Sequence, residues 1–278
     1  MKYIKTMSLL MAALLTACSS SDGDTKEEPR PMIVDIVDTR TDAATTTSSL
    51  RSFSMNYLGT YKYDFSRADE STPWNTNTWP SGVGNDVKIN FYAYTGGTFY
   101  YNGGVPYVVY NVGENNAFVQ HDLLVAKHEL ISFNDAGGHV SLLFGHACTA
   151  VTFHVYITNT LRNNLGHDLT VNSIVLRNVN NMGNYNYGTN SWTNVSGTAS
   201  YTLNGGNLDV TTESQQLPCK YLFMIPQNRA ADGTTGTYLE INYTTSATKT
   251  AIIPLAIDWK IGETFNFDIK LGTTTIKL

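Results

Sequence analysis

The chain has 278 residues, of which 42% are hydrophobic and 15% are charged, with a formal net charge of −5. This hydrophobic fraction is large enough for a folded core and excludes wholesale disorder. Lys and Arg number 18 against 23 Asp and Glu, and no run of five basic residues occurs, so we expect no nucleic-acid partner. Tyr, Thr, Gly and Asn recur throughout, which favours strands joined by turns.

The first residues are typical of an export signal. Lys2 and Lys5 precede an apolar stretch that is too short to span a bilayer and that ends in Leu15-Thr16-Ala17-Cys18. This ending resembles the lipobox of bacterial lipoproteins, in which the Cys is lipidated and becomes the new N-terminus; a generic secretory cleavage site is the alternative. We therefore expect residues 1–17 to be a lipoprotein signal peptide. Cys18 would carry the lipid (palmitate), and the protein would be anchored in the outer membrane.

Residues 18–31 are predicted to form a flexible acidic tether. Ser, Asp, Glu, Lys and Pro dominate the segment, and such residues have little apolar surface to bury. The acidic side chains after Cys18 look like those of lipoproteins that are exported to the cell surface.

From residue 32 onward the sequence predicts strands and turns, with no sustained helical period. A first strand is expected at 32–37, followed by a Thr-rich loop at 39–49. The later strands are expected at 50–58, 87–94, 107–112, 122–126, 140–146, 151–157, 170–179, 207–212, 221–225, 237–244, 249–256 and 264–271.

The strand spacing indicates an all-β fold with two β-sandwich domains. A hinge between the two domains is predicted at Asp135-Ala136-Gly137-Gly138. It divides the folded part of the chain into residues 32–136 and 137–278. Apolar residues then change from even to odd positions, so we expect a bulge or a strand break near Cys148 to Ala150.

The sequence offers little that suggests catalysis. Cys148 and Cys219 either pair or remain buried free thiols, and neither has a metal-binding spacing. The six His residues also lack such a spacing; they are His121, His128, His139, His146, His154 and His167. No nucleophile elbow or phosphate loop occurs, so we expect no enzyme, no cofactor and no metal.

Aromatic residues are concentrated in two places, the run from Phe91 to Tyr110 and a loop with Trp74 and Trp79. Exposed rings at these places would stack on sugars, whereas buried rings would form strand core and cross-strand pairs. The sequence alone leaves both interpretations open.

A series of short motifs along the chain resembles the fimbrillin-like lipoproteins, the subunits of type V pili. The order and spacing of the motifs carry the resemblance more than any single one. They are Asn90-Phe91-Tyr92-Ala93-Tyr94, Asp122-Leu123-Leu124-Val125-Ala126, the alternating runs 140–147 and 151–155, Ser173 to Asn178, Phe223-Met224-Ile225-Pro226-Gln227, and Trp259 to Phe265.

The resemblance implies two tandem transthyretin-like β-sandwiches of Greek-key type. In such proteins an Arg-specific protease removes an N-terminal strand, and a strand of the neighbouring subunit fills the exposed groove. On this chain the cleavage candidates are Arg40 and, second, Arg51, which lies in a strand-like pattern. The strand-exchange candidates are Met32, Ile33, Val34, Ile36 and Val37 in the first strand, and Ile276 and Leu278 in the C-terminal donor.

We therefore expect a structural fimbrial subunit, or a tip or accessory pilin, that serves cell adhesion at the cell surface. Its partners would be other pilus subunits, the outer membrane through the lipid anchor, an Arg-specific protease, and a host or bacterial surface ligand. The alternative is a surface lipoprotein that binds glycan or host protein and does not polymerise.

Overall fold

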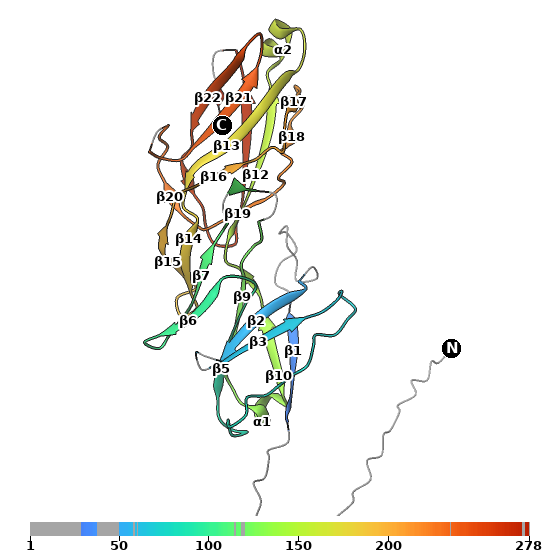
Figure 1. The fold of residues 1–278 in the computed structure, drawn as a ribbon, viewed down its shortest axis with the longest axis vertical. Helices are drawn as coiled ribbons and strands as arrows, with labels where there is room; N and C mark the ends of the chain where they lie inside the picture. The colour runs from blue at the N-terminus through green and yellow to red at the C-terminus, as the bar shows by residue number, and fades with distance from the viewer. Residues whose placement is uncertain are drawn as a thin grey trace, which may run out of the picture.

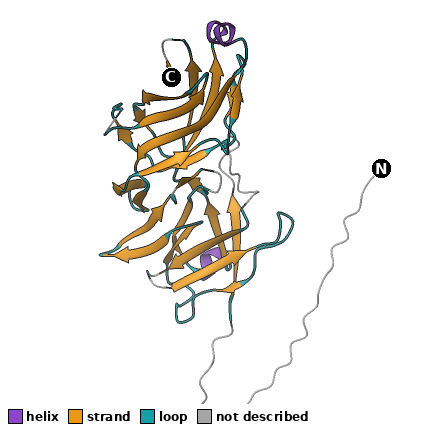
Figure 2. Cartoon of the chain, turned by 45° about the horizontal axis from the view of Figure 1, so that its top comes forward, coloured by secondary structure: helices purple, strands orange, loops and turns teal. Residues whose placement is uncertain are grey.

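The computed structural model describes residues 29–37, 50–57, 59, 61–113, 115–117, 120–233, 235–273 and 276–277. Strands make up most of these residues, and the predicted all-β sandwich fold is confirmed (Figure 2). Within the described part of the chain the helices are α1 (Phe133–Ala136) and α2 (Asn159–Leu165). Figure 1 shows them at the bottom and top of the molecule. Neither is long and apolar enough to cross a membrane.

The first sandwich packs two sheets against each other. The strand order of the larger sheet is β11-β9-β5-β2-β3, with bounds Gly145–His146, Leu124–Ile131, Ile89–Tyr94, Ser52–Tyr57 and Tyr61–Ser66. The order of the smaller sheet is β10-β1-β4, with bounds His139–Leu143, Pro31–Val37 and Asn77–Thr78. The first strand was predicted at 32–37 and begins one residue earlier.

The second sandwich also has two main sheets. One contains β18 (Gln215–Gln216), β12 (Thr149–Ile157), β24 (Thr264–Leu271) and β25 (Ile276–Lys277), with β19 (Leu222–Met224) on β12. The other contains β22 (Thr248–Pro254), β21 (Tyr238–Thr244), β13 (Leu169–Val179), β16 (Ala199–Thr202) and β8 (Asn115–Asn116), with β17 (Leu208–Val210) on β13.

Two smaller sheets complete the fold. A four-stranded sheet has the order β15-β14-β7-β6, with bounds Ser191–Ser196, Met182–Asn186, Val105–Asn111 and Thr98–Asn102. A two-stranded sheet pairs β20 (Asn228–Arg229) with β23 (Ile257–Asp258). In Figure 1 the four-stranded sheet lies at one side, where the two sandwiches meet.

Strand β5 contributes to both hydrophobic cores. Phe91 and Ala93 belong to the core of the first sandwich, whereas Tyr92 and Tyr94 belong to the core that fills the second. The β6–β7 hairpin lies over the second face of β5, with the Phe99 ring 5.9 Å from the rings of both Tyr92 and Tyr94. Because both faces are covered, β5 is a continuous buried run rather than an alternating one.

The two cores divide the chain later than the sequence suggested. Residues 137–146 were assigned to the second domain, yet Val140, Leu142 and Phe144 pack in the first core. Gly137 and Gly138 form no hinge: they have φ of 60° and 83° and lead from the end of α1 into β10. The predicted break near Cys148 is confirmed, because β11 ends at residue 146 and β12 begins at residue 149.

The Trp79 side chain fills the centre of the first core, so its removal tests this packing. Trp79 is 2% exposed and makes edge-on contacts with Phe91 and Phe133 at 5.5 and 5.6 Å. We expect Trp79→Ala to lower the free energy of unfolding by about 3–5 kcal/mol, because a large buried ring leaves a cavity. Trp74→Ala, at a half-buried ring on the other side of β4, should cost clearly less. Urea unfolding followed by circular dichroism measures both; equal costs would contradict the assignment of Trp79 to the core.

Candidate strand-exchange site

Strand β1 is built into the first sandwich from the N-terminal end of the described chain. It runs parallel to β10, with a register from Ile33 opposite His139 to Val37 opposite Leu143. On its other side it meets β4 only at Pro31 and Met32. Most of β1 therefore has one paired edge, and parallel pairing is slightly less stable per residue than antiparallel pairing.

The side chains of β1 alternate between the core and the surface. Met32 and Val34 are 1% and 8% exposed and lie in the first core, whereas Ile33 is 43% exposed. Ile36 is half-buried and packs on the same core. Three of the predicted strand-exchange residues, Met32, Val34 and Ile36, thus occupy apolar pockets of the sandwich, which is the pattern that one face of an inserted strand presents.

Arg30 fixes the N-terminal end of β1. Its guanidinium donates hydrogen bonds to the carbonyl oxygens of Pro80 and Val83 at 3.1 and 2.9 Å, and it also contacts the side-chain oxygen of Asn85. The same group lies over the Phe133 ring, 5.3 Å from its centre. The Trp79 amide donates to the Arg30 carbonyl at 2.7 Å. We refer to this set of contacts as the Arg30 clamp.

Two further contacts hold β1 against β10. The His139 imidazole and the Asp35 carboxylate pair across the two strands at 2.7 Å, and both are half-exposed. The Ile33 amide donates to the Gly138 carbonyl at 2.9 Å. A Cβ atom at Gly138 would lie 2.7 Å from the Pro31 carbonyl, so only glycine lets β1 pass this close.

The remaining predicted site residues are spread over the chain. Arg51 is exposed and lies just before β2, where its carbonyl accepts a hydrogen bond from the Arg67 amide at 2.9 Å. Ile276 lies in β25, opposite Leu271 of β24. The lipidation candidate Cys18, the cleavage candidate Arg40 and the donor candidate Leu278 lie outside the described residues.

The C-terminal strands form a second parallel arrangement. Strand β24 runs parallel to β12 over eight positions, from Thr264 to Leu271. Strand β25 then folds back on β24 and pairs at only two positions. The last described strand is therefore attached by a short ladder, in contrast to the long ladder of β24.

The histidines are distributed among separate contacts. His146 pairs with Asp122, and both side chains are buried. Burial raises the pKa of the Asp122 carboxyl, and the adjacent imidazole opposes that shift. His154 lies 3.9 Å from Asp268. No group of three or more His, Cys, Asp or Glu residues in the described ranges could hold a metal ion. Cys148 and Cys219 are both buried and free.

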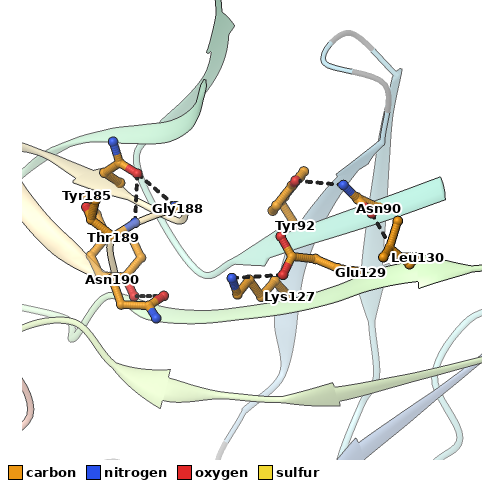
Figure 3. A network of polar contacts seen from close by, with 10 residues as sticks. Asn90, Tyr92, Lys127, Glu129, Leu130, Tyr185, Gly188, Thr189 and Asn190 are labelled. Carbon is orange, nitrogen blue, oxygen red and sulfur yellow. Dashed lines mark hydrogen bonds and ion pairs between the residues drawn. The ribbon is translucent and has the colours of Figure 1, made fainter. Parts of the chain in front are cut away.

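A cleft of mixed polar and apolar lining lies between the first sandwich and the β14–β15 turn. It has a volume of about 350 Å³ and is lined in part by Lys127, Tyr185 and Asn190. Lys127 pairs with Glu129 at 2.9 Å, and the Tyr185 hydroxyl donates to Asn190 at 3.5 Å (Figure 3). Each of these pairs lies on one side of the cleft, within β9 or within the β14–β15 hairpin, so the polar groups of the lining already have local partners.

The Arg30 clamp and the pair between Asp35 and His139 were not predicted from the sequence. Arg30 was placed in the flexible tether, although it directly precedes the first apolar run. The flanking Pro29 and Pro31 were the available signal, because proline restricts itself and its predecessor to extended backbone. Trp79, considered as part of a sugar-binding loop, is instead a core residue. Trp74 packs under the Arg67 guanidinium at 4.7 Å.

Comparison with known proteins gives a consistent result. A family model described as fimbrillin-like matches residues 32–278. A fimbrial protein of Bacteroides vulgatus has the same fold, with a TM-score of 0.60 and 17% identity, over 88% of this chain and 96% of that chain. A candidate cell adhesion protein of Bacteroides uniformis has a TM-score of 0.56 and 15% identity, over 91% and 96% of the two chains.

A candidate cell adhesion protein of Bacteroides ovatus is similar as well, with a TM-score of 0.55 and 14% identity, over 90% of this chain and 94% of that chain. No match was found among curated protein sequences. At these identities the solved structures show a shared fold, and the family model extends over the whole of the sequence that follows the predicted tether. The chain belongs to the fimbrillin-like family.

Proposed function

We propose that this protein is a subunit of a surface fimbrium, either a structural pilin or a tip or accessory subunit, that serves cell adhesion. It is exported as a lipoprotein through Cys18, reaches the surface of the outer membrane, and assembles by strand exchange after cleavage by an Arg-specific protease. The observation that carries this proposal is the insertion of β1: a whole strand of the first sandwich ends at Val37, three positions before Arg40.

Cleavage after Arg40 would change how β1 is held. The strand would lose its covalent link to the body and be held by the β10 ladder, the short pairing with β4, the core contacts of its apolar side chains, the pair of Asp35 and His139, and the Arg30 clamp. Its departure would expose the free edge of β10 and an apolar groove. An incoming strand would restore both the backbone hydrogen bonds and the buried side chains.

The C-terminal tail is the proposed donor strand. Ile276 and Leu278 alternate with Lys277, so both would face the same pockets in an inserted strand. Among the described residues, detachment of β25 from β24 breaks the pairing at Lys270 and Leu271. Each net backbone hydrogen bond contributes about 1 kcal/mol, so this step costs little compared with the gain from filling the groove.

This proposal gives the protein a structural role and no catalytic one. Its partners are other pilus subunits, the membrane through the lipid on Cys18, and the protease. It needs no cofactor.

The cleavage step can be tested with an arginine-specific endoprotease on residues 19–278 under native conditions. We expect a first cut after Arg40, because the Arg30 side chain and carbonyl are engaged in the clamp and the Arg51 carbonyl is hydrogen-bonded. Mass spectrometry of the new N-terminus identifies the cut. Arg40→Lys should block it, and Arg51→Lys, the matched control, should leave it unchanged. A first cut at Arg30 or Arg51 would contradict the assignment.

The Arg30 clamp should set how long β1 stays in the groove after cleavage. Arg30→Ala removes the hydrogen bonds to the Pro80 and Val83 carbonyls and to the Asn85 side chain, together with a cation–π contact, a loss of roughly 2 kcal/mol. The cleaved β1 fragment should then dissociate about 30-fold faster, as measured by gel filtration and mass spectrometry over time. Arg67→Ala is the control, because the contacts described for Arg67 are with Leu50, Glu70 and Trp74. Equal release from both variants would refute a specific clamp.

If the tail is the donor strand, substitutions at residues 276 and 278 should affect assembly, whereas a substitution at residue 277 should not. Ile276→Ser combined with Leu278→Ser should abolish filaments of the cleaved protein in negative-stain microscopy, because two pocket-filling side chains are lost. Lys277→Ser, between them, should leave assembly intact. The monomers should unfold at nearly the same denaturant concentration, since β25 pairs at only two positions. Normal filaments from the double variant would exclude the tail as donor.

A further inference from the structure

Two segments without any charged residue come together in the four-stranded sheet β15-β14-β7-β6. Residues 89–113 and 178–208 contain no Asp, Glu, Lys, Arg or His, and each supplies two of the four strands. Charged residues ordinarily make up about 25–35% of a protein surface. The inner face of this sheet is buried in the second core, which accounts for its lack of charge. The outer face is exposed or half-buried, and burial does not account for it there.

The outer face carries two rows of side chains that cross all four strands. The strand registers define one row as Ser191, Asn186, Tyr107 and Tyr100, and the other as Thr193, Asn184, Val109 and Thr98. Three interstrand spacings make each row about 14 Å long. We call these two rows the Asn–Tyr face. Figures 1 and 2 show the sheet that carries it at the side of the molecule, with the β6–β7 hairpin extending outward.

Two tyrosine rings are stacked at one end of the Asn–Tyr face. Tyr100 and Tyr107 lie opposite each other across β6 and β7, with ring centres 5.5 Å apart and planes inclined by 16°. Tyr100 is 47% exposed. The two rings form an apolar platform whose hydroxyl groups make no hydrogen bond within the described part of the chain. Tyrosine combines such an apolar ring with a polar tip.

Two amides lie on β14, one of the two central strands of the Asn–Tyr face, opposite Tyr107 and Val109 of β7. The Asn184 side chain has no hydrogen-bond partner among the described residues. The Asn186 side-chain oxygen accepts from the amides of Gly188 and Thr189 at 2.7 and 3.2 Å, which fixes the orientation of that side chain. An amide offers two donors and an acceptor at fixed angles, so the pair presents an ordered set of neutral hydrogen-bonding groups.

We propose that the Asn–Tyr face binds a neutral glycan. Sugar hydroxyl groups both donate and accept hydrogen bonds, which matches the amide and hydroxyl groups of the centre. The apolar faces of sugar rings suit the tyrosine platform. The absence of charge leaves no attraction for acidic polysaccharides, nucleic acids or anionic lipid headgroups.

The layout of the face argues against a protein partner. Protein interfaces place apolar residues at the centre and polar residues at the rim. Here Asn184 and Asn186 share the centre with Tyr107 and Val109, and the exposed apolar residues Val105 and Met182 lie at the two ends of the sheet, so the centre is not an apolar patch. The inference does not depend on strand exchange: the face lies on strands that pair with neither β1 nor β25, and the test uses the uncleaved monomer.

Native gel electrophoresis of residues 19–278 through gels that contain a soluble polysaccharide tests the proposal. The neutral probes are mannan, galactomannan, xyloglucan, arabinoxylan and dextran, and the charged probes are polygalacturonate and chondroitin sulfate. We expect retardation by at least one neutral probe, with the same strength at low and high salt. Tyr100→Ala combined with Tyr107→Ala, and separately Asn184→Asp, should each weaken binding by about tenfold or more. Tyr61→Ala, at a tyrosine that is 58% exposed on β3, is the matched control and should bind normally.

The proposal is overturned if no neutral probe retards the protein, if only the charged probes do, or if both sets of variants bind like the wild type. Loss of self-association in the tyrosine variants, without any loss of glycan binding, would assign the face to contacts between copies instead. Circular dichroism melting confirms folding, and Asn184→Asp keeps the test decisive if the tyrosine variants unfold. Failure here leaves the cleavage and filament experiments unaffected, so the two proposals are judged separately.

Discussion

The pairing of β1 with β10 is the contact on which the arrangement of the first sandwich depends. A sheet edge exposes unpaired amides and carbonyls, and β1 covers the edge of β10 while Met32 and Val34 close the core beneath it. The strand comes from the N-terminal side of the chain, and its neighbour in the sheet lies about a hundred residues later. No short connection aligns two parallel strands so distant in sequence, so the Arg30 clamp and the pair of Asp35 and His139 help to hold β1 in register with β10.

Much of the fold was predictable because apolar and polar residues alternate in a strand that has one buried and one solvent-exposed face. The strands at 170–179, 237–244 and 264–271 were placed within a residue or two. Strands β3, β6, β14 and β15 were missed, since they are rich in Asn, Thr, Ser and Tyr and carry a weak apolar period. The limit between the two domains was placed too early, at Gly137. A pair of glycines that ends a helix looks the same in the sequence as a pair of glycines in a hinge.

Strand β1 of the candidate site could be predicted from the sequence, whereas the contacts of Arg30 and His139 that hold it could not. The apolar run of Met32 to Val37 identified β1, because β-branched residues in alternation favour a strand. Arg30 and His139 act through partners at residues 80, 83, 133 and 35, and such long-range contacts leave no local pattern. The Asn–Tyr face arises in the same way, since only the strand registers reveal that two distant charge-free segments share one surface.

The two-sided burial of β5 has a consequence for how the molecule unfolds. Phe91 and Tyr92 are neighbours in the chain but belong to different cores, so melting either sandwich would strip one face of the same strand. The Tyr187 hydroxyl, which donates to the Ala93 carbonyl at 2.8 Å, ties the second sandwich to that strand as well. Units linked in this way lose their native structure together, and denaturation then gives a single cooperative transition instead of two independent ones.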